Sequence, residues 1–164
     1  MPRPLPFRDT YRLRLREAPD GFPDAPAIVS LLALWQDKRG DRRMPSRDDF
    51  AVEDLRLWLG YVSLVDVTAE PRRFRWRLIG SGIARQLGRD ATGRWFDELY
   101  DKEMLEGYVG AYSKAVERRQ PVYHEGDLEF VGKEFRHFRS VHLPLSDDGE
   151  AVNMLLLGLD FDPV

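Results

Sequence analysis

Three strand-like segments follow one another at the end of the chain, and two short turns join them. The segments cover residues 121–130, 134–145 and 151–161. Val-Gly-Lys-Glu at 131–134 predicts a tight hairpin, and Ser-Asp-Asp-Gly-Glu at 146–150 predicts the second turn. Strands joined by turns this short run antiparallel. The last segment is apolar on both faces, which places it in the centre of a sheet that is covered on both sides.

The first sixty residues contain two predicted helices and an arm that precedes them. The first helix begins after Asp24, which can cap it. A second, shorter helix begins near Ser46, because Ser46 and Asp49 three residues later resemble a capping box. Asp48 and Asp49 are the alternative caps. The arm at 11–17 alternates in polarity, which fits either a short strand or an extended segment on the surface. We expect residues 1–60 to form an N-terminal arm and helical cap, not an independent domain.

Residues 61–164 are expected to form the main domain. Alternation at 61–68 and 73–80 predicts two further strands, and short helical turns follow them. The segment 101–119 is the longest helical pattern of this half. Its apolar stripe consists of Met104, Tyr108, Tyr112 and Ala115. The order of elements therefore predicts an α+β domain with an antiparallel sheet.

The glycine pair at Gly80 and Gly82 suggests a phosphate-binding loop at first sight. A dinucleotide fingerprint requires a third glycine where this chain has Arg85. It also requires a parallel strand–helix–strand unit, whereas the strand at 73–80 is predicted to pair in a hairpin. We therefore interpret the two glycines as a turn that lets the strand lead into a tightly packed helix.

Composition excludes several classes of chemistry. The chain has no cysteine, which excludes disulfides, thiolate metal sites and cysteine nucleophiles and fits a reducing compartment. A net charge of −3 is too small to indicate a nucleic-acid or membrane partner. The N-terminus has no secretory pattern, and the apolar run at 154–161 is far shorter than the ~20 residues of a membrane-spanning helix. We expect a cytoplasmic protein.

The order of elements resembles that of the PAS domain family. In addition, LLALWQDKRGDRRMPSRDDF at 31–50, followed by DLRLWLGYVSLVDV, is similar to short stand-alone bacterial proteins of this type. In these proteins a PAS-like domain follows a helical segment with an LWQxKRGxRxMPxRxDF-type motif. The resemblance covers about residues 28–160. It implies a five-stranded antiparallel sheet with short helices and one long helix on one face, preceded by N-terminal helices.

The resemblance also implies a function. PAS domains are sensor and interaction modules that often bind a small ligand between the long helix and the sheet, and they often dimerise. We therefore expect a small-molecule sensor or a signalling module for protein interaction. Only Asp-Pro-Val follows the last strand, so no output domain of its own is expected and the signal would pass through a homodimer or a separate partner, by way of the N-terminal helices. The alternatives are a small enzyme that uses the same pocket and a purely structural dimerisation adaptor.

Cofactor versions of the family can be compared with this sequence. A haem sensor of this fold carries an axial histidine on the long helix, and residues 101–120 contain none. Photoactive flavin and coumaroyl versions require a cysteine, which the chain lacks. A non-covalent ligand, flavin included, stays open, and the sequence does not identify it.

The predicted hairpin turn of four residues determines which side chains share a face of the sheet. With this register, His124 lies on the same face of the sheet as His137 and Arg139, and this face is expected to look toward the long helix. A buried guanidinium requires a carboxylate, carbonyl groups or a ligand anion. The sequence therefore predicts a ligand site in which Arg139, His124 and His137 hold a polar or anionic group. Tyr108 and Tyr112 would supply apolar walls and hydroxyl groups.

Simpler interpretations stay open beside this one. The two histidines and Arg139 can equally lie near an open edge or pair with acidic residues of the long helix. His137 and His142 are five residues apart in a strand and point to opposite faces, so no metal site is expected. The sequence contains no catalytic motif, so it favours a protein without enzymatic activity over an enzyme. The basic run Lys38–Arg47 lacks interleaved aromatic residues and does not indicate nucleic-acid binding.

Overall fold

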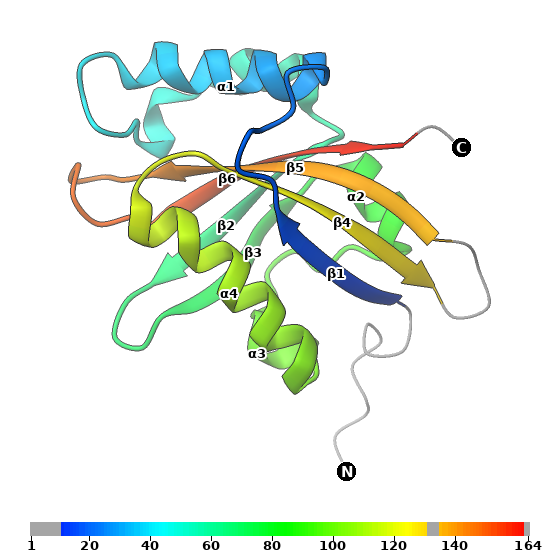
Figure 1. Cartoon of the computed structure of the whole chain (residues 1–164). Coiled ribbons are helices and arrows are strands. Elements are labelled where there is room, and N and C mark those ends of the chain that lie inside the picture. The colour runs from blue at the N-terminus through cyan, green and yellow to red at the C-terminus, as the bar shows by residue number, and fades with distance from the viewer. Residues whose placement is uncertain (1–10, 131–134, 163–164) are drawn as a thin grey trace.

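One antiparallel sheet of six strands forms the centre of the molecule (Figure 1). The computed structural model describes residues 11–130 and 135–162. The strand order is β1-β4-β5-β6-β2-β3, and every neighbouring pair is antiparallel. The strands are β1 (Tyr11–Glu17), β2 (Val62–Thr68), β3 (Arg73–Ile79), β4 (Val122–Phe130), β5 (Phe135–Leu145) and β6 (Met154–Phe161). The predicted α+β class is confirmed, and β6 is a central strand as expected.

The predicted number of five strands is wrong. The arm at 11–17 is a sixth strand, and it pairs with β4 from Tyr11↔Phe130 to Glu17↔His124. Its alternating pattern fitted both a strand and a surface arm, because an edge strand has a neighbour on one side only.

Helices cover both faces of the sheet. Figure 1 shows α1 on one side, and α4 with α3 on the other. The helical segments are α1 (Pro26–Arg39), the 3₁₀ helices η1 (Arg47–Asp49) and η2 (Val52–Trp58), α2 (Ser81–Leu87), α3 (Phe96–Leu99) and α4 (Lys102–Arg118). The second predicted helix is therefore a pair of 3₁₀ turns.

The ends of α1 and η1 test the predicted caps. Ala25, and not Asp24, is the N-cap of α1, and no side chain caps it. The Asp24 carboxylate lies instead 3.4 Å from Nη1 of Arg139. At η1 the capping box is confirmed, because the backbone N–H of Ser46 donates to Oδ2 of Asp49 at 2.7 Å.

The long helix α4 presents a buried stripe to the sheet. The Asp101 carboxylate caps it by accepting from the backbone N–H of Met104 at 2.9 Å. Its buried residues are Met104, Tyr108, Ala111, Tyr112 and Ala115. The i, i+3 and i+4 spacing of this set is that of one helix face, as predicted.

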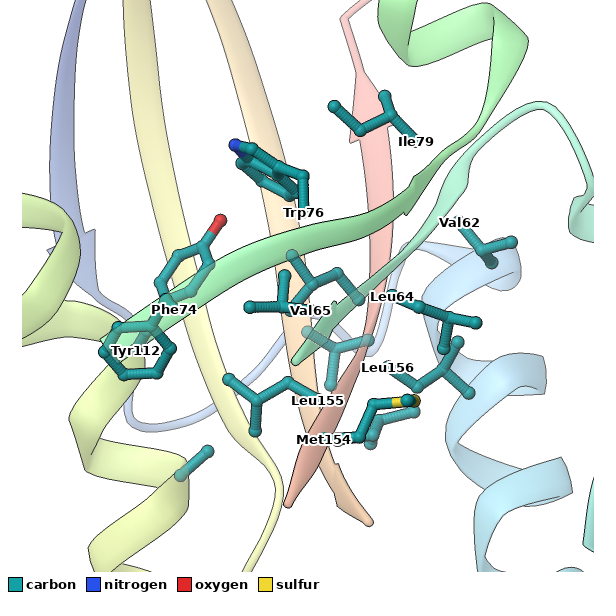
Figure 2. Close-up of a cluster of buried hydrophobic side chains, with 14 of the residues drawn as sticks. Val62, Leu64, Val65, Phe74, Trp76, Ile79, Tyr112, Met154, Leu155 and Leu156 are labelled. Carbon is teal, nitrogen blue, oxygen red and sulfur yellow. The ribbon is translucent and has the colours of Figure 1, made fainter. Parts of the chain in front are cut away.

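Apolar side chains pack on both faces of the central strands. Figure 2 shows Leu64 and Leu156 on the side of α1, and Phe74 and Tyr112 on the side of α4. Leu156 is completely buried. The molecule therefore has two layers of core, one under each helix, with the sheet between them.

The turn at Gly80 and Gly82 is confirmed as a packing device. A Cβ at Gly80 would lie 2.6 Å from the carbonyl oxygen of Gly60, and a Cβ at Gly82 would lie 2.8 Å from the same atom. The backbone N–H of Gly80 donates to the carbonyl of Val62 at 2.9 Å. Only glycine lets the two backbones approach this closely.

The predicted register between β4 and β5 is wrong by one residue. His124 pairs with Ser140, and the ladder continues to Glu129↔Phe135. Since the side-chain period of a strand is two, this shift moves His137 and Arg139 to the face of α1. The turn at 131–134, from which the register was predicted, lies outside the described residues.

The apolar pattern of β5 could not correct the error. Val141, Leu143 and Leu145 are all buried. They lie under α1, on the face away from His124. Because both faces of the strand are covered, the more apolar face is not the one that looks toward α4.

Candidate functional site

A small cavity lies between α4 and the sheet. Its volume is about 40 Å³, against the roughly 10–15 Å³ that one buried water needs. Leu13 and Leu15 of β1 form part of its wall. The polar side chains in the lining are Ser63, Trp76, Tyr108, Tyr112, Ser140 and His142. Of the residues that the structure describes, no Asp, Glu, Lys or Arg lines it.

Two buried histidines stack beside this cavity. The rings of His124 and His142 have their centroids 4.6 Å apart and are inclined by 23°. Each side chain is only 1% exposed. The ring of Tyr112 meets His142 edge-on, with centroids 4.5 Å apart.

Several polar atoms of this cluster have no hydrogen-bond partner within the described residues. They are Nδ1 and Nε2 of His124, Nδ1 of His142 and Oγ of Ser63. The fourth imidazole nitrogen, Nε2 of His142, lies 3.4 Å from Oγ of Ser140. That hydroxyl also donates to the carbonyl oxygen of His124 at 3.3 Å. Buried polar groups without partners are rare in folded proteins, so this cluster requires an explanation.

Burial keeps both imidazoles neutral. Loss of solvation lowers the pKa of His124 to about 4, with smaller contributions from Lys114 and Arg118 that also lower it and one from Glu17 that raises it. Loss of solvation likewise lowers the pKa of His142, and His124 adds to the effect. At neutral pH each ring therefore carries one N–H donor and one acceptor nitrogen.

Aromatic side chains surround the cluster. Tyr108 stacks on Tyr100 with ring centroids 4.3 Å apart. Tyr112 meets Phe96 edge-on at 5.4 Å, and the two rings belong to one continuous aromatic group. Burial raises the pKa of Tyr112, so its phenol stays protonated. The structure thus brings Tyr108, Tyr112 and His124 to one interior, as the sequence predicts.

His137 and Arg139 do not join this group. Nη2 of Arg139 donates to Oδ2 of Asp160 at 2.8 Å on the other face of the sheet. Nδ1 of His137 lies 3.1 Å from Oδ1 of Asp127. The predicted grouping of the two residues with His124 is therefore wrong. Carboxylates of neighbouring strands bind both side chains, and the buried Nε of Arg139 has no hydrogen-bond partner within the described residues.

Comparison with known proteins agrees with this architecture. A family model described as a PAS domain matches residues 24–159. The chain belongs to the PAS domain family. No curated protein matches it. PAS domains commonly serve as sensor or signalling modules and bind small ligands.

The limits of the match explain the extra strand. Strands β2 to β5 and most of β6 lie within the matched residues, and β1 precedes them. The five strands expected for a PAS domain are therefore all present. The sixth strand is an addition at the edge of the PAS sheet.

Ser63, Ser140 and His142 were not predicted as members of the site. Ser140 and His142 follow directly from the observed register, because they alternate on the same face as His124. Ser63 lies on β2, far from them in the sequence, and pairs with Leu157 of the neighbouring strand β6. No sequence signal distinguishes a serine in this place from one at the surface.

A larger groove of about 380 Å³ lies at the end of β6, between α1, η2 and α2. Ile28, Leu31 and Trp58 form its apolar wall. Leu159 and Phe161 line both this groove and the small cavity. The two side chains therefore stand between the interior of the PAS domain and an open surface.

Among the described side chains, no group of three or more His, Asp or Glu could hold a metal ion. Within residues 11–130 and 135–162, no helix has the length and apolar character to cross a bilayer.

Proposed function

We propose that this PAS domain is a sensor of a small molecule that binds between α4 and the sheet. In this proposal the ligand contacts Tyr108, Tyr112, His124 and His142. The observation that carries it is the cluster of unpartnered buried polar atoms on His124, His142 and Ser63 beside a cavity. A cytoplasmic location is part of the proposal, and the lack of cysteine supports it.

These unpartnered polar atoms carry an energetic cost. Each buried donor or acceptor without a partner costs about 1–3 kcal/mol. An interior with a purely structural role would avoid this cost with apolar side chains of the same size. A bound molecule would supply the missing partners, so the interior is suited to a ligand better than to packing alone.

The size of the cavity requires a movement on binding. Ligand sites usually have volumes of about 300–1,000 Å³, and this cavity has about 40 Å³. We place the entrance at Leu159 and Phe161, because they also line the larger groove. Displacement of these two side chains would join the two spaces.

The signal would leave through the N-terminal elements. Glu17 of β1 accepts a hydrogen bond from Nζ of Lys114 on α4 at 3.0 Å, and it also pairs with Arg118. A ligand that shifts α4 would therefore act on β1. Val52 and Leu57 of η2 are 64% and 84% exposed. They offer an apolar surface to a second copy or to a separate signalling partner.

The N-terminal motif has a structural role that supports the resemblance to short bacterial PAS proteins. Trp35, Met44 and Phe50 are all buried. Nη1 of Arg47 donates to the carbonyl oxygen of Phe50 at 2.8 Å. These residues hold the helical cap on the sheet.

The geometry gives less support to an enzyme. His142 lies 3.4 Å from the hydroxyl of Ser140, which superficially resembles a nucleophile and its base. A catalytic pair of this kind requires a third group that orients the imidazole. Nδ1 of His142 has no such partner among the described residues.

Native mass spectrometry of the purified protein tests the proposal. We expect a mass above that of the chain, and the excess should disappear on denaturation. The double variant His142→Phe/Ser140→Ala should lose the extra mass, because it removes two of the polar side chains that line the cavity. His137→Gln is the matched control on the opposite face and should keep it. An excess that survives the double variant would show that the ligand binds elsewhere.

A further inference from the structure

The interior offers no opposite charge to a charged ligand. The side chains that line the cavity are apolar, hydroxyl-bearing or aromatic, with the one imidazole of His142. A carboxylate or ammonium group that enters such a site loses its hydration and gains no counter-ion. A charged ligand would therefore bind poorly unless a nearby ionic group could move in.

The nearest ionic groups are already paired. Lys114 and Arg118 both bind Glu17 at the edge of the sheet. Arg139 binds Asp160 on the opposite face. Recruitment of Arg139 would remove this cation from Asp160, and recruitment of Lys114 or Arg118 would leave Glu17 with one cation where it now has two.

The histidines do not serve as cations at neutral pH. With a pKa of about 4, His124 is protonated in roughly one molecule in a thousand at pH 7. An anion that requires protonated His124 would thus lose about a thousandfold in affinity. The neutral ring instead presents one N–H and one acceptor nitrogen, and neither has a partner in the part of the chain that the structure describes.

The unpartnered atoms therefore require a ligand with both kinds of hydrogen-bonding group. His124 offers a donor and an acceptor, and the hydroxyl of Ser63 can act in either role. Amides, lactams and ureas carry donors and acceptors on one uncharged group. Trp76, Tyr108 and Phe138 supply the apolar surface for the rest of such a molecule.

We infer that the interior site binds an uncharged molecule that carries hydrogen-bond donors and acceptors on an apolar or aromatic frame. This inference rests on the proposed function and adds the chemical class of the ligand. It excludes organic acids, amines and phosphorylated compounds. It keeps the polar group that the sequence predicts and drops the anionic alternative, since that alternative depended on Arg139.

Nine probes in three matched sets test the class. The first set is acetamide, acetate and ethylamine; the second is benzamide, benzoate and benzylamine; the third is indole-3-acetamide, indole-3-acetate and tryptamine. Within a set the members have similar shape and differ in charge. Binding is followed at pH 7 through the ¹⁵N resonances of the three imidazoles, which single histidine variants assign. His137 is the internal control, because it lies on the other face.

We expect an amide to shift the His124 and His142 resonances and to bind at least tenfold more tightly than the acid and the amine of its set. Ser63→Ala should weaken that binding, and His137→Gln should not. Equal or tighter binding of an acid or an amine at the same resonances would overturn the inferred class and leave the proposed function standing. If none of the nine probes shifts these resonances, the interior is closed to small molecules, and both proposals fall.

Discussion

At the scale of single residues, burial of the stacked histidines costs free energy, because their nitrogen atoms lose hydration. Neutral imidazoles fit a core better than charged ones, yet their nitrogen atoms still require partners. His124 and His142 share this property because each is 1% exposed. A pair of phenylalanines would fill similar space at lower cost. In the proposed function a ligand supplies the missing partners, and burial of the two rings makes the stability of the fold sensitive to acid.

This sensitivity predicts how stability changes with pH. The pKa of both histidines is lower in the folded state than the value of about 6.5 in an unfolded chain. The unfolded state thus binds more protons, and stability is complete above about pH 6.5 and falls as the pH approaches 4. For His124 the loss is on the order of 3 kcal/mol. Lys114, Arg118 and Glu17 are the charged groups that act on His124.

Chemical denaturation at pH 7.5 and pH 4.5 checks this prediction. The variant His124→Gln/His142→Gln should lose most of the difference between the two pH values. The control His137→Gln should keep it, because His137 is partly exposed and lies on the other face. An unchanged pH dependence in the double variant would show that other groups cause the acid sensitivity.

At the scale of elements, β5 shows how far the sequence determines the site. Strand and helix patterns predicted β2 to β6 and α4, because alternation and helical spacing are local properties. The composition of the site depends on the register of β4 and β5. The observed register differs from the predicted one by one residue, so Ser140 and His142, and not Arg139, share a face with His124. The sequence of a four-residue turn does not determine the register of the two strands that it joins. A strand that is buried on both faces contains no local signal for the register either. The position of Ser63 in the cavity lining follows from the tertiary fold alone.

The edge strand β1 is the element whose role is most open to test. Leu13 and Leu15 line the cavity, so β1 closes the interior of the PAS domain at its edge. We expect Leu13→Ala/Leu15→Ala to lower stability by about 2 kcal/mol, since both side chains are partly buried. Hydrogen exchange should rise in β4, which is the only strand that pairs with β1 in the described residues.

The exposed Arg14 of the same strand supplies the control. Arg14→Ala leaves both leucines in place and should change neither the stability nor the exchange of β4. Unaltered exchange in the leucine variant would mean that β1 is held by its backbone ladder alone.

At the scale of the whole molecule, the sheet separates two different cores. The core under α4 contains the polar cluster, and the core under α1 is apolar and continues into the groove at the end of β6. The buried side chains of β5 and β6 on the α1 side require a cover, and the N-terminal helix supplies it. The helical cap is thus part of the fold, and in the proposed function it also carries the surface that meets a signalling partner. A tight anchor for α1 is expected for that reason.

Two tryptophans allow this anchor to be measured. Nε1 of Trp35 on α1 donates to the carbonyl oxygen of Pro144 on β5 at 2.9 Å, and the bond is buried. Nε1 of Trp58 donates to the carbonyl oxygen of Ala27 at 3.1 Å, where water can replace it. Trp35→Phe should cost about 1–3 kcal/mol, because it leaves a buried carbonyl without its donor. Trp58→Phe removes the same atoms at the surface and should cost less than about 1 kcal/mol. Urea denaturation measures both values, and similar losses would mean that α1 is attached by apolar contact alone, with no contribution from the bond across the two layers.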